Sequence, residues 1–293
     1  DERREMWTKK ETLQNEPLLN EKGLTGGGYY VEYRTDDARL TIEVLKKAVD
    51  LGATLLNYVK VESFSYNRKG NVSGVELMDQ LTGEEYHVYG RQIVNATGPW
   101  IEQLVEQDEP IKGKSLFHTK GIHIVFDQAK FPLRQSIYFD VPDGRMIFAI
   151  PRSGKTYVGT TDTEYNGPLQ NPHITIGDKQ YLLDAIHDMF PHVSVKMEDI
   201  ESSWAGVRPL IQEEGKDPSE ISRKDEIWVA KSGLMTIAGG KLTGYRQMAE
   251  DIVDQVVRTH KFKHAQKCAT KHLPLSGANG INAKNFQGYI GNK

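Results

Sequence analysis

Two glycine-containing turns, each at the end of an apolar run, restrict the fold of this chain most. The first covers residues 95–100 (NATGPW) and follows an apolar run that ends at Val94. The second covers residues 237–246 (IAGGKLTGYR) and follows the apolar residues 234–238. Small residues let backbone N–H groups approach a ligand at the carboxyl end of a strand, where α/β folds bind nucleotides. One such turn is equally typical of an ordinary strand-to-helix connection, but two of them in one chain favour a nucleotide cofactor.

The composition is that of a globular protein without a disulfide framework and without a basic excess for nucleic acid. A length of 293 residues suggests about two domains, and 26% charged with 38% hydrophobic residues is typical of a globular protein. The net charge of −3 gives no basic excess, so we expect no nucleic acid partner. A single cysteine, Cys268, excludes a disulfide framework and a cysteine-built metal site, and we expect a cytoplasmic protein without a metal. No apolar run reaches the ~20 residues of a membrane span, whereas a peripheral contact with the inner face of the cell membrane stays open.

The sequence lacks one pattern that a complete dinucleotide-binding fold needs. No Gly-x-Gly-x-x-Gly segment stands between an expected strand and an expected helix. The first residue is an aspartate, and residues 263–293 are polar with little periodicity. We therefore expect the chain to be the middle of a longer protein, with residues 263–293 as a linker toward a further domain.

Hydrophobic spacing predicts a mixture of helices and antiparallel strands. Helices are expected over residues 1–12, 37–51, 175–189 and 243–260. Asp36 or Asp37 can cap the second helix, and Gly52 can end it. Strands are expected over residues 29–33, 54–64, 72–79, 85–94, 121–126, 145–150 and 156–160. Turns at residues 67–71 and 82–83 predict an antiparallel meander.

A few polar residues among the strands indicate where chemistry occurs. His123 stands between two isoleucines, so its side chain must face away from theirs, although a lone histidine of this kind is more often structural. Arg208 lies in an apolar segment before a proline, and Lys241 stands in the second glycine turn. Arg208, Arg223 and Lys241 are either ordinary surface charges or a set of cations that binds a dianionic phosphate. The forked donors of a guanidinium match the oxygens of a phosphate well.

Six motifs, in this order, resemble the FAD-dependent glycerol-3-phosphate dehydrogenase/oxidase family, and the opening residues resemble most its Gram-positive α-glycerophosphate oxidase branch. The motifs are residues 36–40 (DDARL), 95–100 (NATGPW), 120–123 (KGIH), 159–162 (GTTD), 206–210 (GVRPL) and 239–246 (GGKLTGYR). The resemblance implies an α/β (α+β) fold, with a partial glutathione-reductase-like FAD-binding domain and an antiparallel-sheet substrate domain of the D-amino-acid oxidase type. The FAD-binding domain would contain residues 1–112 and 231–262, and the substrate domain would contain residues 113–230. Residues 1–27 can instead pack on the substrate domain.

The resemblance also implies a reaction and the residues that carry it. The complete protein would oxidise sn-glycerol 3-phosphate to dihydroxyacetone phosphate by hydride transfer to FAD, with oxygen or a quinone as the final electron acceptor. His123 and Lys241 correspond to catalytic residues, and Arg208, Arg223 and Lys241 to residues that bind the substrate. The implied cofactor-binding residues are Val61, Ala96, Thr97, Gly98, Trp100, Gly239, Gly240, Leu242 and Thr243.

Two other interpretations stay open. One is a related FAD-dependent amine or 2-hydroxy-acid oxidase on the same fold, whose carboxylate substrates need fewer cations. The other is a purely structural fragment without activity. Because the segment that holds the pyrophosphate is absent from this sequence, we expect FAD in the complete protein and not in the isolated chain.

Overall fold

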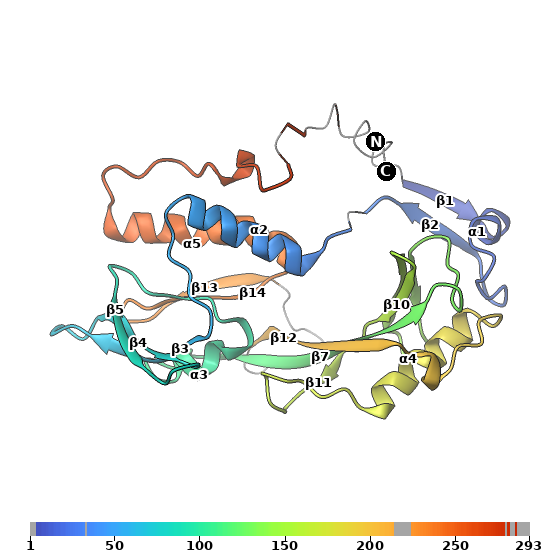
Figure 1. The fold of residues 1–293 in the computed structure, drawn as a ribbon, viewed down its shortest axis with the longest axis horizontal. Helices are drawn as coiled ribbons and strands as arrows, with labels where there is room; N and C mark the ends of the chain where they lie inside the picture. Colours follow the sequence, from blue (N-terminus) through green and yellow to red (C-terminus); the bar gives the residue numbers. More distant parts are fainter. Residues whose placement is uncertain (1–3, 33, 214–223, 279, 282–284, 286–293) are drawn as a thin grey trace. The chain divides into compact units, whose positions relative to one another are not determined.

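The chain folds into two compact units, each of which mixes helices and strands (Figure 1). The computed structural model describes residues 4–32, 34–213, 224–278, 280, 281 and 285. Unit 1 contains residues 1–33, 98–100 and 115–221. Unit 2 contains residues 34–97, 101–114 and 222–293. The predicted mixed fold class with antiparallel sheets is confirmed.

A six-stranded sheet forms the centre of unit 1. Its strands follow the order β11-β7-β10-β9-β8, and β12 also pairs with β7. Figure 1 labels β7, β10, β11 and β12 of this sheet. The strands are β7 Lys114–Asp127, β8 Ile137–Asp140, β9 Met146–Arg152, β10 Lys155–Gly159, β11 Thr163–Glu164 and β12 Ser202–Glu213. The long strand β7 runs antiparallel to β10 and β11, so several later segments of the chain meet along it. The strands predicted over residues 121–126, 145–150 and 156–160 are confirmed.

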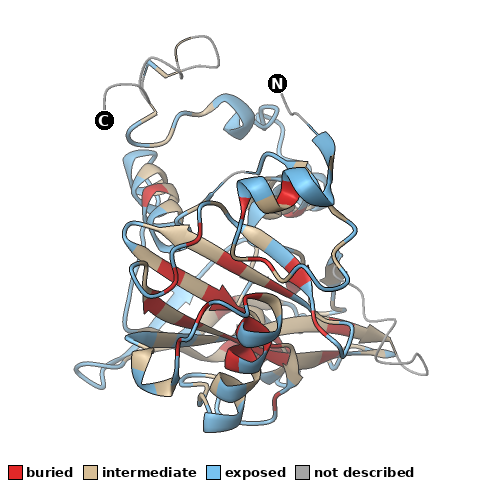
Figure 2. Cartoon of the chain, turned by 90° about the vertical axis from the view of Figure 1, so that its right-hand side faces the viewer, coloured by how far each residue is buried: buried red, intermediate tan, exposed pale blue. Residues whose placement is uncertain are grey.

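One face of this sheet carries the hydrophobic core of unit 1. Ile122, Ile124 and Phe126 of β7 are fully buried, and Figure 2 shows the same alternation of buried and less buried residues along the strands. Helix α4 (Ile176–Met189) packs its buried leucine and isoleucine side chains into this core. His123 stands between the two isoleucines and faces the opposite side, as the period of two residues in a strand requires.

The opening segment differs from the prediction. Residues 4–8 form the strand β1 (Arg4–Thr8) instead of a helix, and only α1 (Lys9–Asn15) is helical. β1 pairs with β2 (Gly26–Tyr30), which begins three residues before the predicted strand over residues 29–33. A Cβ atom at Gly26 would overlap the Trp7 carbonyl oxygen of β1, so a residue without a side chain allows this close pairing. Residues 1–3 of the predicted helix lie outside the described residues.

Unit 2 contains two three-stranded sheets, in the orders β3-β4-β5 and β13-β14-β6. Their strands are β3 Val59–Tyr66, β4 Val72–Asp79, β5 Glu85–Tyr89, β6 Val94–Asn95, β13 Asp225–Val229 and β14 Met235–Gly239. The predicted meander is confirmed, since β3, β4 and β5 pair antiparallel in sequence order. The strand predicted over residues 85–94 is instead divided into β5 and β6 by a bend at residues 91 and 92.

The predicted helices of unit 2 are confirmed. The remaining helices described are α2 Asp37–Asp50, α3 Ile101–Val105, α5 Tyr245–His260, and the short 3-10 helices η1 Gly98–Trp100, η2 Met197–Asp199, η4 Leu242–Gly244 and η5 Thr270–His272. The Asp36 side chain caps α2, and Gly52 follows its end with a φ of 96°. Helix α5 covers β13 and β14 (Figure 1) with an apolar stripe that includes Met248 and Ile252. In the part of the chain that the structure describes, every helix is too short or too polar to cross a lipid bilayer.

Candidate functional site

The face of the unit 1 sheet opposite its core gathers aromatic rings around His123. The imidazole of His123 stacks on the indole of Trp204, with ring centroids 4.7 Å apart and an interplanar angle of 8°. Tyr157 approaches the same imidazole edge-on, with centroids 6.2 Å apart. Three strands supply these residues, β7 for the histidine, β10 for the tyrosine and β12 for the tryptophan.

Two glycines leave the space that this arrangement needs. Gly159 pairs with His123 across β10 and β7, and a Cβ atom at position 159 would lie 2.7 Å from both Cγ and Nε2 of the imidazole. A Cβ atom at Gly121 would lie 2.6 Å from Nη1 of Arg208. Real Cβ atoms essentially never come so close to other heavy atoms, so glycine at these positions lets a ring and a guanidinium lie across the strands.

Arg208 is held beside this histidine by groups of one loop. Its Nη2 donates to the Thr160 hydroxyl at 2.9 Å, and its Nη1 donates to the Thr161 carbonyl at 3.3 Å. Nη1 also forms an ion pair with Asp162 at 3.4 Å. The side chain remains 36% exposed, so a ligand can still reach this cation.

The surroundings keep His123 neutral. Burial, with a smaller contribution from the positive charge of Arg208, lowers the pKa of His123 to about 4. Its buried Nδ1 atom has no hydrogen-bond partner among the described residues. An imidazole without its proton can accept one from a substrate, so His123 has the protonation state of a general base near neutral pH.

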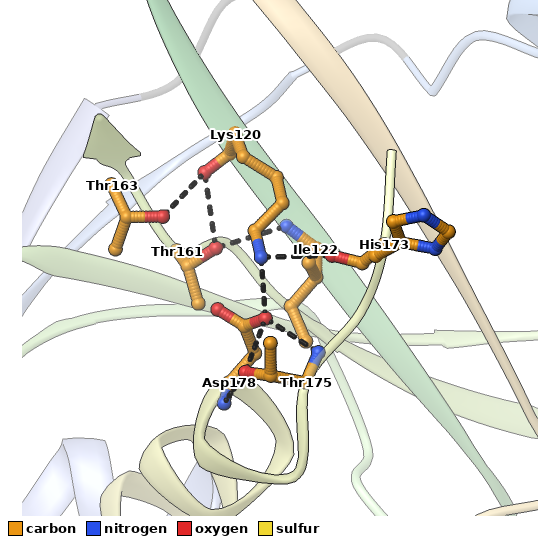
Figure 3. Close-up of polar contacts among 7 residues, drawn as sticks. All are labelled: Lys120, Ile122, Thr161, Thr163, His173, Thr175 and Asp178. Carbon is orange, nitrogen blue, oxygen red and sulfur yellow. Dashed lines mark hydrogen bonds and ion pairs between the residues drawn. The ribbon is translucent and has the colours of Figure 1, made fainter. Parts of the chain in front are cut away.

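A buried ion pair fixes the strand just before His123 (Figure 3). Nζ of Lys120 donates to Asp178 at 2.6 Å and to the His173 carbonyl at 2.9 Å, and the two charged side chains are only 8% and 9% exposed. Burial raises the pKa of Asp178, but hydrogen bonds from Lys120 and Thr175 lower it by more, so that it lies below its usual value. Because Asp178 is also part of the capping box of α4, this pair ties the helix to β7.

The Thr161 hydroxyl holds the same strand from the other direction (Figure 3). It accepts from the Ile122 backbone N–H at 3.1 Å and donates to the Lys120 carbonyl at 3.2 Å. The motif at residues 159–162 therefore positions the strand of His123 and the guanidinium of Arg208.

Both glycine turns begin at neighbouring parallel strands of unit 2. β6 and β14 pair in parallel, with Thr236 opposite Asn95, so the two turns leave the same edge of one sheet. Gly239 and Gly240 both have a φ of 75°, a conformation that favours glycine. A Cβ atom at Gly240 would also lie 2.7 Å from the Met248 sulfur. The carboxyl edge of parallel strands is where α/β folds bind nucleotides.

The first turn is organised by a buried amide that the sequence analysis did not single out. Oδ1 of Asn95 accepts from the backbone N–H of Thr97 at 3.2 Å and from its hydroxyl at 2.7 Å, and Nδ2 donates to the Ile101 carbonyl at 3.3 Å. Within unit 1, Nε2 of His118 lies 3.0 Å from the Pro99 carbonyl oxygen in η1. Side chains therefore fix this turn on both sides of Gly98.

The other predicted site residues fall in different places. Lys241 is exposed and begins η4, whereas Val61 lies on β3 and packs against the small core around Phe64. Within the described part of the sheet, β3 pairs only with β4, so its outer edge can offer backbone groups to a ligand. Arg223 lies outside the described residues.

Sequence reasoning gave no role to Trp204 and Tyr157, which make the ring contacts with His123. The alternation along β12 contains a usable signal, because Trp204 and Arg208 are four residues apart and must share one face of the strand. The position of β12 beside β7 could not be read from local spacing.

Comparison with known proteins identifies the family. The sequence profile of the FAD dependent oxidoreductase family matches residues 1–246, and the chain belongs to this family. It is 60% identical over 293 residues to the aerobic glycerol-3-phosphate dehydrogenase of Bacillus subtilis (strain 168), a match that covers 99% of this chain and 52% of that protein. It is 57% identical over 296 residues to the protein of the same name from Staphylococcus aureus (strain USA300), covering 100% of this chain and 53% of that protein.

A solved structure gives the same result. The glycerol-3-phosphate dehydrogenase from Bacillus halodurans, complexed with FAD, superposes with a TM-score of 0.88 at 49% identity, covering 98% of this chain and 55% of that chain. The resemblance predicted from the six motifs is therefore confirmed. The chain spans about half the length of the curated relatives that it matches.

The second turn, residues 237–246 of unit 2, fits the cofactor that the family name implies. Neither Lys241 at the start of η4 nor Gly244 at the start of α5 makes a side-chain capping hydrogen bond. Uncapped N–H groups at a helix start can bind polar or anionic groups of a ligand, and the glycines before them keep the approach free of side chains. These residues can hold one part of FAD, while a glycine fingerprint for the pyrophosphate is not in the printed sequence.

Proposed function

We propose that this chain is part of a flavoenzyme that oxidises sn-glycerol 3-phosphate to dihydroxyacetone phosphate. The similarity to glycerol-3-phosphate dehydrogenases along the whole chain supports this proposal. The observation that carries it is the pair formed by a neutral histidine and an adjacent arginine on the open face of the unit 1 sheet. FAD, when bound, supplies the acceptor for the hydride that leaves C2 of the substrate.

In this proposal His123 accepts the proton of the C2 hydroxyl group. Removal of that proton is needed as the hydride leaves, because the product is a ketone. The low pKa of His123 keeps the imidazole unprotonated near neutral pH, and it also makes this ring a weaker base than a free imidazole. The positive charge of Arg208 also favours a hydroxyl group that is losing its proton.

Arg208 binds the phosphate of the substrate. A guanidinium held by Thr160 and Asp162 is already ordered, so little side-chain entropy is lost when a dianion binds. We propose Arg223 as the second phosphate ligand, as the family resemblance implies. The division into a substrate domain of residues 113–230 and FAD-binding segments of residues 1–112 and 231–262 is part of the same proposal.

The two glycine turns, residues 95–100 and 237–246, hold the flavin in this proposal. Lys241 provides a cation that favours negative charge on the reduced ring and also contacts the substrate. The proposed contacts are Val61, Ala96, Thr97, Gly98, Trp100, Gly239, Gly240, Leu242 and Thr243. Asn95 acts through this turn by fixing Thr97.

Two electron acceptors, oxygen and a membrane quinone, are compatible with this chemistry. Formation of hydrogen peroxide during turnover identifies oxygen, whereas reduction of an added quinone without peroxide identifies the quinone. A quinone acceptor would also require a peripheral contact of the cytoplasmic protein with the membrane.

Substrate-driven flavin reduction tests the proposed function. The complete protein is mixed without oxygen with sn-glycerol 3-phosphate, glycerol, glycine or L-lactate, and the flavin absorbance is followed. We expect the absorbance of the oxidised flavin to fall rapidly with sn-glycerol 3-phosphate and not with the other three compounds. Reduction by glycine or L-lactate, with none by sn-glycerol 3-phosphate, would assign the chain to the amine or 2-hydroxy-acid oxidases instead.

A further inference from the structure

Among the described residues, no hydrogen bond to Nδ1 orients the imidazole of His123. Many catalytic histidines are oriented by a carboxylate or a carbonyl that accepts from the second ring nitrogen. Nδ1 of His123 is buried and has no such partner among the described residues. Packing must therefore determine the plane in which this ring lies.

That packing comes from Gly159 and from two aromatic side chains. The backbone of Gly159 leaves no room for a side chain on one side, since a Cβ atom there would overlap the imidazole. On another side the Trp204 indole lies nearly parallel to the ring, at 8° and 4.7 Å between centroids. Tyr157 contacts both rings, with centroids 6.2 Å from His123 and 5.7 Å from Trp204, so the three side chains form one cluster.

The charges around the cluster give the ring no stabilisation when it is protonated. From β10, His123 faces the phenol of Tyr157, and from β12 it faces the guanidinium of Arg208. The carboxylate of Asp162 forms an ion pair with this guanidinium. A cation beside the imidazole opposes the imidazolium form. The stacked indole has two effects, since it keeps water from the ring, which opposes that form, and its π face attracts a cation, which favours it. Because burial is the largest cause of the low pKa of His123, we expect the exclusion of water to be the larger effect.

We propose that Trp204 is a positioning residue for His123, whose indole plane fixes the imidazole and excludes water from it in place of a hydrogen-bonded partner. Trp204 acts through His123 and need not touch the reacting atoms. The part of this inference that concerns turnover rests on the proposed function, whereas the part that concerns the ring itself does not. Loss of the indole then has two effects, since water hydrates the imidazole and the ring gains freedom to turn.

The direct test is the titration of His123 in the complete enzyme. Histidine labelled with 13C at Cε1 reports each imidazole by NMR, and His123→Gln assigns the signal. We expect Trp204→Leu to raise the pKa of His123 by about one pH unit or more, toward its ordinary value. Trp204→Phe, which keeps an aromatic ring, should give a smaller rise in the same direction and serves if the leucine variant does not fold.

A matched control is available in the same unit. Trp7 stacks on Tyr29 with centroids 4.6 Å apart at 13°, so Trp7→Leu removes a similar ring pair elsewhere. We expect this variant to leave the pKa of His123 unchanged. An unchanged pKa of His123 in every folded Trp204 variant, or an equal rise in Trp7→Leu, would overturn the proposal.

The kinetic test separates positioning from substrate binding. We expect Trp204→Leu to lower kcat by roughly 10-fold with less than about 3-fold change in KM, and to move the acidic limb of kcat/KM to higher pH. Trp204→Phe should recover most of kcat. A normal kcat and pH profile in Trp204→Leu would refute the role in turnover. If His123→Gln itself turns over normally, the proposed function of His123 fails, while the NMR result still decides what Trp204 does to the ring.

Discussion

Gly159 lies directly opposite His123 in the β10–β7 pair, and the imidazole occupies the space that a side chain at position 159 would fill. The ring is stacked on Trp204 on another side, so it cannot move away freely. The shape of the site is therefore set by a residue without a side chain as much as by the residues with chemical groups.

A methyl group at position 159 should displace the imidazole. We expect Gly159→Ala to destabilise the protein by about 1–3 kcal/mol, as overpacking does, and to reduce turnover severely. Gly206→Ala is the matched control, because a Cβ atom at Gly206, on β12, meets no heavy atom within 4 Å. Denaturant unfolding and steady-state kinetics measure both effects. Equal free energies of unfolding and equal turnover rates in the two variants would contradict this prediction, because they would mean that the His123 imidazole can move without loss of stability or activity.

The low pKa of His123 makes stability depend on pH. The pKa lies at about 4 in the folded protein and near 6.5 in the unfolded chain, so the unfolded chain binds more protons between these values. The contribution of His123 to the free energy of unfolding is therefore fully present above about pH 6.5, and it is lost as the pH falls toward 4. Between pH 7.5 and 5, His123 should account for a loss of about 2 kcal/mol. We expect this loss to be absent in His123→Gln when unfolding by urea is compared at the two pH values.

The buried Lys120–Asp178 pair should matter far more than an exposed pair. Lys120→Met leaves a buried carboxylate without its cation, which typically costs about 3–5 kcal/mol. Lys155 is the control, because its contacts with Asp127 and Glu201 are exposed and Lys155→Met should cost at most about 1 kcal/mol. Adding Asp178→Asn to Lys120→Met should restore part of the lost stability, since it removes the isolated charge. Unfolding curves of the variants decide between these outcomes.

Arg208 should control binding of the substrate phosphate. Arg208→Gln removes a charged hydrogen-bond donor and should raise KM for sn-glycerol 3-phosphate by an amount equivalent to about 2 kcal/mol, or roughly 30-fold. Arg208→Lys should recover only part of this, because the fork geometry is lost. Arg258→Gln changes an exposed arginine on α5 and provides the control. An unchanged KM in Arg208→Gln would remove this residue from the phosphate site.

The local features of the fold could be predicted because short-range physics determines them. The alternation in β7 placed His123 away from Ile122, and the caps at Asp36 and Gly52 marked the ends of α2. The hairpin at the start of the chain was missed because Gly26 and its neighbours read as a break. In fact they allow β2 to lie close to β1.

Two kinds of contact could not be predicted, those between distant segments and those of a side chain with the backbone of its own turn. The stack of His123 on Trp204 depends on β12 lying beside β7, and no period or turn within either segment records that pairing. Asn95 was passed over because its side chain acts on the backbone of its own turn. Sequence spacing therefore singled out His123 and Arg208 but missed Trp204 and Asn95, which contact or position neighbouring groups.

The rate of flavin reduction by sn-glycerol 3-phosphate in His123→Gln, measured without oxygen in a single turnover of the complete enzyme, tests the central claim most directly. If His123 accepts the C2 hydroxyl proton, the rate should fall by roughly 10²–10⁴-fold while the FAD content stays that of the unchanged enzyme. A rate within about threefold of the unchanged enzyme, at full FAD content, would show that the histidine is structural and that proton transfer occurs elsewhere.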